Sequence, residues 1–151
     1  MLTIHAADEV RPTWDATDPV EDGAVAVEGT RIAAVGTLAE LQERFPGARV
    51  RSWPGVLGPA RLHEGPLPDA PSPRERVHAV LKLGAAAVLE AYVDSPGLRA
   101  AAARNDVLVL PGPGPHPLRL VEAGRADLAV LDDRGACIAT VCAGRLVHRR
   151  R

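Results

Sequence analysis

His63, Glu64 and His116 are the residues of this sequence whose types and positions could do chemistry. Imidazole nitrogens and carboxylate oxygens are common ligands of Zn²⁺. His63 and Glu64 precede a Gly-Pro pair, and His116 lies in the run Pro-Gly-Pro-Gly-Pro-His-Pro at residues 111–117, so both places are predicted to be loops. Histidines in two separate loops are more often solvated than bound to one ion. We therefore keep the three as candidate catalytic residues, expect no cofactor or metal, and hold Zn²⁺ as the alternative.

The other candidate side chains have structural explanations. Lys82, the only lysine, follows Arg74 and His78 at steps of four residues, the spacing of one solvated helix face. Cys137 and Cys142 lie five residues apart in an apolar stretch that is predicted to be a strand. An odd spacing on a strand sends two side chains to opposite faces, so we expect two buried, reduced thiols rather than a disulfide.

Composition indicates a globular protein of ordinary domain size. The 151 residues are 46% apolar and 25% charged, with a formal net charge of -1. This balance gives no electrostatic reason to expect nucleic acid or an anionic membrane as a partner. No apolar run approaches the roughly 18 residues of a membrane span, and the first residues lack the pattern of a secretory signal, so we expect a cytoplasmic protein. The length also excludes a complete (β/α)₈ barrel of about 250 residues.

The two ends of the chain are predicted to be β-structure. Residues 23–36 indicate a hairpin, because Val25 and Val27 alternate with small residues on either side of a Glu-Gly-Thr turn. Thr37 and Glu40 form a capping box for a short helix that ends at Phe45-Pro46-Gly47. Further strands are predicted at residues 2–6, 50–57 (broken at Pro54-Gly55), 126–131, 137–142 and 145–148.

The middle of the chain has a different pattern. Five prolines between residues 58 and 73 predict a stretch without regular structure. Ser72-Pro73 and Ser95-Pro96 are helix starts, each with serine as N-cap and proline at the first helical position. The first helix is predicted to end at Gly84 and the second at Arg104, and they alternate with buried strands at residues 85–93 and 107–110. This alternation predicts a parallel βαβ unit with one more helix.

Three stretches together resemble the metal-dependent amidohydrolase superfamily, the group of urease, imidazolonepropionase and aminodeoxyfutalosine deaminase. They are the hairpin at residues 23–36, the run Trp-Pro-Gly-Val-Leu-Gly-Pro-Ala-Arg-Leu-His at residues 53–63, and the closing strands at residues 124–131 and 143–147. The resemblance implies an α+β fold in which both chain ends, residues 1–57 and 118–149, build one composite β-sandwich.

The same resemblance implies that a catalytic TIM barrel should lie between those two ends. Residues 58–117 number only sixty, which at about 30 residues for each βαβ step holds two strands and two helices. We therefore expect the barrel to be missing, replaced by a short βαβ-type insert, and residues 1–151 to form a single compact unit.

The site that the resemblance implies is also incomplete. Such hydrolases place an Asp or Asn and a His-x-His pair at the end of the first barrel strand, where divalent metals activate a water. Here that segment is Arg61-Leu62-His63-Glu64-Gly65, so His63 alone matches and no family-type metal is expected.

These observations predict an amidohydrolase-like, imidazolonepropionase-like composite-domain protein that is non-catalytic and has a binding, scaffolding or regulatory role. The alternative is a metal-dependent hydrolase of non-peptide C–N bonds, with a rebuilt site at His63, Glu64 and His116 or with a barrel supplied by a partner chain. Strands taken from a closed barrel leave open sheet edges. We therefore expect a homodimer or a partner chain that covers the insert.

Overall fold

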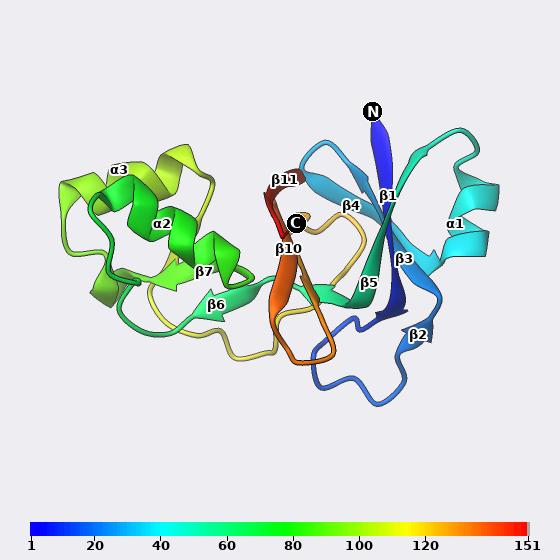
Figure 1. Cartoon of the computed structure of the whole chain (residues 1–151), viewed down its shortest axis with the longest axis horizontal. Coiled ribbons are helices and arrows are strands. Elements are labelled where there is room, and N and C mark those ends of the chain that lie inside the picture. Colours follow the sequence, from blue (N-terminus) through cyan, green and yellow to red (C-terminus); the bar gives the residue numbers. More distant parts are fainter. Residues whose placement is uncertain (151) are drawn as a thin grey trace.

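Residues 1–150, which the computed structural model describes, form two sheets that lie side by side (Figure 1). The larger, here called the composite sheet, contains β1 (Leu2–Val10), β2 (Val20–Glu21), β3 (Gly23–Glu28), β4 (Arg31–Thr37), β5 (Arg49–Pro59), β9 (Leu128–Leu131), β10 (Cys137–Cys142) and β11 (Arg145–Arg149). The smaller, here called the middle sheet, contains β6 (Arg61–His63), β7 (Ala85–Leu89) and β8 (Leu108–Leu110). The helices are α1 (Leu38–Arg44), α2 (Pro73–Lys82), α3 (Pro96–Arg104) and the 3₁₀ turn η1 (Glu90–Tyr92).

The composite sheet joins the two ends of the chain. Its strands lie in the order β11-β10-β9-β5-β1-β3-β4, and β2 pairs with β1. Strand β5 is the seam, because it runs parallel to β1 on one side and antiparallel to β9 on the other. The predicted α+β fold with a composite of both chain ends is confirmed.

This sheet folds over on itself into a sandwich. Val25 of β3 and Val141 of β10 belong to one buried cluster although they come from opposite halves of the sheet. The outer edge of β4 is also paired, since Ile32 N donates to Gly124 O at 2.8 Å and Ala123 N donates to Ile32 O at 2.8 Å. The returning chain before β9 therefore covers the edge that β4 would otherwise leave open.

The other face of the N-terminal strands is covered by α1. Thr37 Oγ1 accepts from Glu40 N at 3.1 Å and contacts the Glu40 carboxylate at 2.9 Å, so the predicted capping box is confirmed. Leu41 of α1 packs in a buried cluster with Ile4 and Ala26. Among residues 1–150, no helix is both long and apolar enough to cross a membrane.

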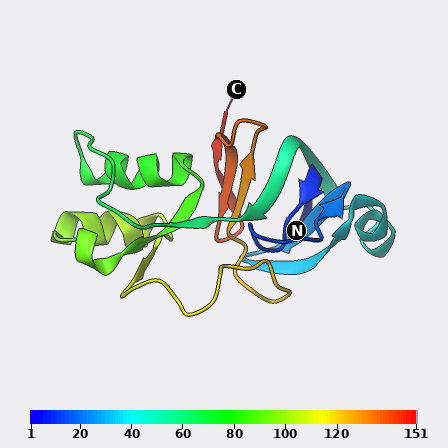
Figure 2. The ribbon, with the colours of Figure 1, turned by 90° about the horizontal axis from the view of Figure 1, so that it is seen from below.

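The middle sheet is a parallel unit in the order β6-β7-β8, connected through α2 and α3. Both helices begin as predicted, with Ser72 accepting from Glu75 N and Ser95 accepting from Leu98 N, each at 3.2 Å. Leu81 of α2 and Val88 of β7 share a buried cluster that also contains Cys142 of the composite sheet. Figure 2 shows the two sheets joined by the chain running from β5 into β6 and by the returning segment 111–127.

Three details of the sequence-based prediction are wrong. The middle piece has three strands rather than two. Strand β6 forms within the proline-rich stretch because its three residues include no proline and pair with β7. Strand β5 continues through Pro54-Gly55, because Gly55 takes a positive φ of 96° at a bulge and its N–H donates to Asp8 Oδ2 at 2.9 Å. Strand β7 ends at Leu89, since residues 90–92 turn into η1.

Candidate functional site

The parallel arrangement of the middle sheet places two of the three predicted site residues, His63 and Glu64, at the carboxyl end of β6. His63 is the last residue of β6, Glu64 follows it, and His116 lies in the loop after β8. In the register of the sheet His63 is level with Val88 of β7. The carboxyl ends of parallel strands are where α/β proteins carry their ligand and catalytic sites. His63 and Glu64 therefore lie where the fold could use them, whereas His116 belongs to the loop that returns to the composite sheet.

The same sheet also keeps these side chains apart. Strand β7 lies between β6 and β8, which separates the ends of those two strands by two strand spacings, about 10 Å. His63 Nε2 lies 2.9 Å from the carbonyl oxygen of Pro66, so Nε2 carries the proton and donates to it. Glu64 and His116 are exposed. Within the described residues, no three side chains of the His, Cys, Asp and Glu types gather closely enough to hold a metal ion.

The donor set therefore does not fit the metal centre that the resemblance implies. His63 is one imidazole where the family has several ligands. Lys82, the only lysine, lies in the last turn of α2 and is exposed together with Arg74 and His78, as expected for a solvated helix face. Burial, together with nearby Lys82, lowers the pKa of His78, so this imidazole is neutral at neutral pH.

A small pocket of about 170 Å³ lies where β7 and β8 meet the returning chain. Its walls are apolar at Ala87, Leu108 and Leu110 and carry guanidinium groups. The Arg61 guanidinium already donates to Leu83 O at 2.9 Å, which anchors the end of α2 to the start of β6. Arg125 is likewise occupied by protein groups. This pocket therefore serves the junction between the two sheets.

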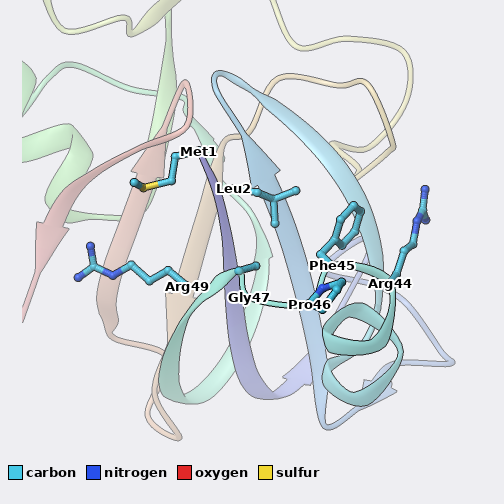
Figure 3. Close-up of a pocket in the computed structure, with 8 residues that line it drawn as sticks. Met1, Leu2, Arg44, Phe45, Pro46, Gly47 and Arg49 are labelled. Atoms are coloured by element: carbon cyan, nitrogen blue, oxygen red, sulfur yellow. The ribbon is translucent and has the colours of Figure 1, made fainter.

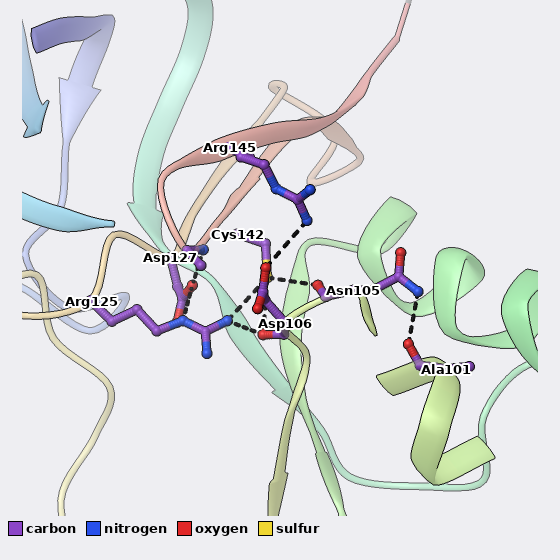
Figure 4. A network of polar contacts seen from close by, with 8 residues as sticks. Ala101, Asn105, Asp106, Arg125, Asp127, Cys142 and Arg145 are labelled. Atoms are coloured by element: carbon purple, nitrogen blue, oxygen red, sulfur yellow. Dashed lines mark hydrogen bonds and ion pairs between the residues drawn. The ribbon is translucent and has the colours of Figure 1, made fainter. Parts of the chain in front are cut away.

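That junction is a network of polar contacts around Arg125 (Figure 4). Asp127 Oδ1 accepts from Arg125 Nε at 3.0 Å and from Ala143 N at 2.8 Å. The same guanidinium donates through Nη2 to the carbonyl oxygen of Asp106 and contacts Cys142 Sγ at 3.2 Å. One arginine and one aspartate thus link the composite sheet to the loop that precedes β8. The sequence analysis predicted only the start of a strand here. Arg125 and Asp127, two opposite charges just after Gly124 in an otherwise apolar stretch, could have indicated this network.

The two cysteines are free, as expected, but only Cys142 is buried, so the expectation that both thiols are buried is wrong for Cys137. Cys142 is buried, and burial is the main cause that raises the pKa of its thiol, so it stays protonated and contacts the carbonyl oxygens of Asn105 and Asp106 at 3.7 and 3.5 Å. Cys137 is half-buried and lies 3.2 Å from Thr140 Oγ1. A protonated buried thiol is a poor nucleophile.

The comparisons with known proteins agree with this architecture. Residues 23–48 match the family described as the imidazolonepropionase-like composite domain of bacteria. Aminofutalosine deaminase of Helicobacter pylori is similar in structure, with 17% identity and a TM-score of 0.53 over 72% of this chain and 32% of that one. Guanine deaminase of E. coli is 14% identical, with a TM-score of 0.55 over 72% of this chain and 35% of that one. An adenosine deaminase of Xanthomonas campestris with bound zinc is 21% identical, with a TM-score of 0.55 over 72% of this chain and 33% of that one.

No curated protein sequence matches the chain, and the chain spans about a third of the length of each of these three structural neighbours. Over 72% of the chain the fold is that of these three neighbours, a mixed α+β structure, with no closed barrel among residues 1–150. The hairpin and helix of residues 23–48 resemble the imidazolonepropionase-like composite domain. The resemblance drawn from the sequence is confirmed.

Proposed function

We propose that this chain is a non-catalytic, amidohydrolase-like protein with a binding, scaffolding or regulatory role. One observation carries the proposal. Within residues 1–150 the middle sheet has three strands, and the carboxyl end of its first strand offers His63 alone, hydrogen-bonded to Pro66 O, where the related hydrolases have several metal ligands. A single imidazole cannot fix a divalent ion and a water at once.

A hydrolysis assay with metal supplied tests this proposal. The purified chain is incubated with Zn²⁺, Mn²⁺ or Fe²⁺ and with a panel of cyclic amides and amidines, and bound metal is measured by elemental analysis. We expect metal well below one equivalent, no turnover above the metal-only blank, and the same result for His63→Ala. His78→Ala, on the exposed face of α2, is the matched control. Metal-dependent turnover that His63→Ala abolishes and His78→Ala retains would overturn the proposal.

A rebuilt hydrolase site is the second candidate, and its support is the position of His63 and Glu64 at the carboxyl end of a parallel strand. It requires the loop after β8 to bring His116 to His63 when a metal or substrate binds. His116→Ala would then reduce turnover as strongly as His63→Ala. Equal loss from both variants, with a stoichiometric metal, would favour this candidate over the non-catalytic one.

A partner that covers the middle sheet stays a prediction, and β8 is where we place it. Strand β8 has no neighbour on its outer side within residues 1–150, and its side chains Leu108 and Val109 are exposed although they are large and apolar. A second copy pairing along this edge would bury both. Sedimentation velocity at micromolar concentration should give a dimer that Val109→Lys dissociates, and a wild-type monomer would contradict this.

A cytoplasmic location is supported by the two free thiols.

A further inference from the structure

The inner face of the composite sheet carries polar side chains at one end. Thr3 and His5 of β1 lie beside Arg49 and Arg51 of β5, because Thr3 pairs with Arg49 and His5 with Arg51 in the parallel register. Partners in a parallel ladder project to the same side of a sheet. Two positive and two neutral polar side chains therefore form one patch within the sandwich.

This patch lines a pocket of about 370 Å³, here called the inner-face pocket. Its opposite wall is the C-terminal hairpin, at Gly144 and Leu146. Figure 3 shows the Arg49 side chain pointing toward the C-terminal strands, on the side of β1 away from Phe45 and Pro46. Apart from Met1, which precedes β1, every residue of the pocket belongs to the composite sheet or its turns, so the pocket is separate from the strand end that carries His63.

His5 contributes a hydrogen-bond donor to this pocket. Trp53 Nε1 lies 3.3 Å from His5 Nδ1, and because an indole nitrogen only donates, Nδ1 accepts and the ring proton lies on Nε2. Burial first and the Arg51 charge second lower the pKa of His5 to about 4, so the ring is neutral at pH 7. His5 is 3% exposed, and its Nε2 has no hydrogen-bond partner within the part of the chain that is described.

The positive charge of the pocket is uncompensated. None of the ion pairs among residues 1–150 includes Arg49 or Arg51. A third guanidinium, that of Arg149, lies 5.6 Å from the ring centre of Trp53, which is the next residue on the same face of β5 after Arg51. Guanidinium groups that lack carboxylate partners attract anions, and two of them together match a doubly charged group.

We propose that the inner-face pocket binds a phosphate group, with Arg49 and Arg51 as charge partners and with Thr3 Oγ1 and His5 Nε2 as neutral donors. Four donor-bearing side chains on one face match a tetrahedral group with several acceptor oxygens better than they match a single planar carboxylate. The ligand is inorganic phosphate or a small phosphate monoester, which share this chemistry. The proposal goes beyond the non-catalytic role and does not depend on it.

Calorimetric titration of the full chain with inorganic phosphate and with glycerol phosphate at pH 7.5 tests it. We expect saturable one-to-one binding that Arg49→Gln and Arg51→Gln each weaken by about tenfold or more. Arg74 is an exposed arginine on α2, outside the composite sheet, so Arg74→Gln removes the same charge at a distant place and should leave binding unchanged. Tighter binding of the ester identifies a monoester as the ligand type, and equal binding identifies the phosphate group alone; both support the proposal.

Three results would overturn it: no saturable binding, an equal loss in Arg74→Gln, or tighter binding of succinate than of either phosphate compound. Histidine ¹⁵N NMR supplies a readout in the wild-type chain, so the test does not depend on a variant that folds. Phosphate should shift the Nε2 resonance of His5 and leave that of His78 in place. A shift of both, or of neither, would contradict binding at this pocket.

Discussion

The composite sheet and the middle sheet differ in how far their edge strands are paired. The composite sheet folds over on itself, and residues 123–126 pair with the outer edge of β4. The middle sheet ends at β6 and β8 with no further strand within residues 1–150. The β4 edge of the composite sheet is therefore covered by the returning chain, whereas β6 and β8 of the middle sheet each have a single neighbouring strand.

The contact between two turns that closes the composite sheet should give the largest effect. Gly144 has a φ of 82°, and a Cβ there would fall on the carbonyl oxygen of Gly29. Gly144→Ala combines the strained backbone with a displaced turn, and we expect a loss of about 3 kcal/mol in the free energy of unfolding, measured in urea.

Gly135→Ala is the matched control for this substitution. Its φ of 79° is as unfavourable, but nothing lies within 4 Å of the added Cβ. Only the backbone strain remains, so we expect a loss of about 1 kcal/mol. Equal losses in the two variants would mean that the turns do not pack against each other.

Acid should weaken the composite sheet through His5. The unfolded chain takes up a proton on this ring near pH 6.5, whereas the folded pKa is about 4, since burial and then Arg51 disfavour the charged ring. Between these values the unfolded state binds more protons, so stability falls as pH decreases from 6.5 toward 4, by up to about 3 kcal/mol. Urea titrations at stepped pH measure this fall, and His5→Gln should flatten it. An unchanged slope in His5→Gln would assign the fall to the carboxylates.

The contact between the two sheets should give a smaller, local effect. Thr140 of β10 is fully buried and donates to Leu81 O of α2 at 2.7 Å. Thr140→Val removes that hydrogen bond, and since Gly84 N still donates to Leu81 O we expect a loss of about 1 kcal/mol. Hydrogen exchange should show lower protection in α2 than in β1. Equal loss of protection in both would mean that the two sheets unfold as one unit.

The smallest effect is expected at the surface of the composite sheet. Arg44 and Glu122 form an ion pair at 3.8 Å, with side chains 58% and 65% exposed. Water screens such a pair, so Glu122→Gln should change stability by less than about 0.5 kcal/mol and should barely move the thermal midpoint. A larger loss would show that α1 and the returning segment depend on each other more than the packing indicates.

Local chemistry made much of the fold predictable from the sequence. The caps at Thr37, Ser72 and Ser95 are decided by neighbouring residues, and the structure confirms each. Strands whose partners are distant were harder to predict. Strand β6 exists because β7 lies beside it, and β5 continues past Gly55 because β9 pairs with it there. Proline content alone argued against both strands.

The candidate site was predictable in position and not in geometry. The sequence indicated His63, Glu64 and His116 as loop residues, but His63 ends β6, and His116 lies in a different loop, after β8. Strand β7 separates His63 from His116. This separation depends on the order of the strands in the sheet, which a local sequence pattern does not reveal. The inner-face pocket was missed although Arg49, Arg51 and Trp53 alternate on β5, because their alignment with Thr3 and His5 depends on the register between β1 and β5.

The central claim is that the middle sheet does not assemble a metal site at His63 and His116. Calorimetric titration with Zn²⁺ at neutral pH tests this claim most directly. Wild type, His63→Ala and His116→Ala are compared after chelator treatment. We predict weak binding that is the same in all three chains. Stoichiometric binding at submicromolar Zn²⁺ in the wild type, lost in both variants, would show that the fragment still assembles a metal site and would contradict the account.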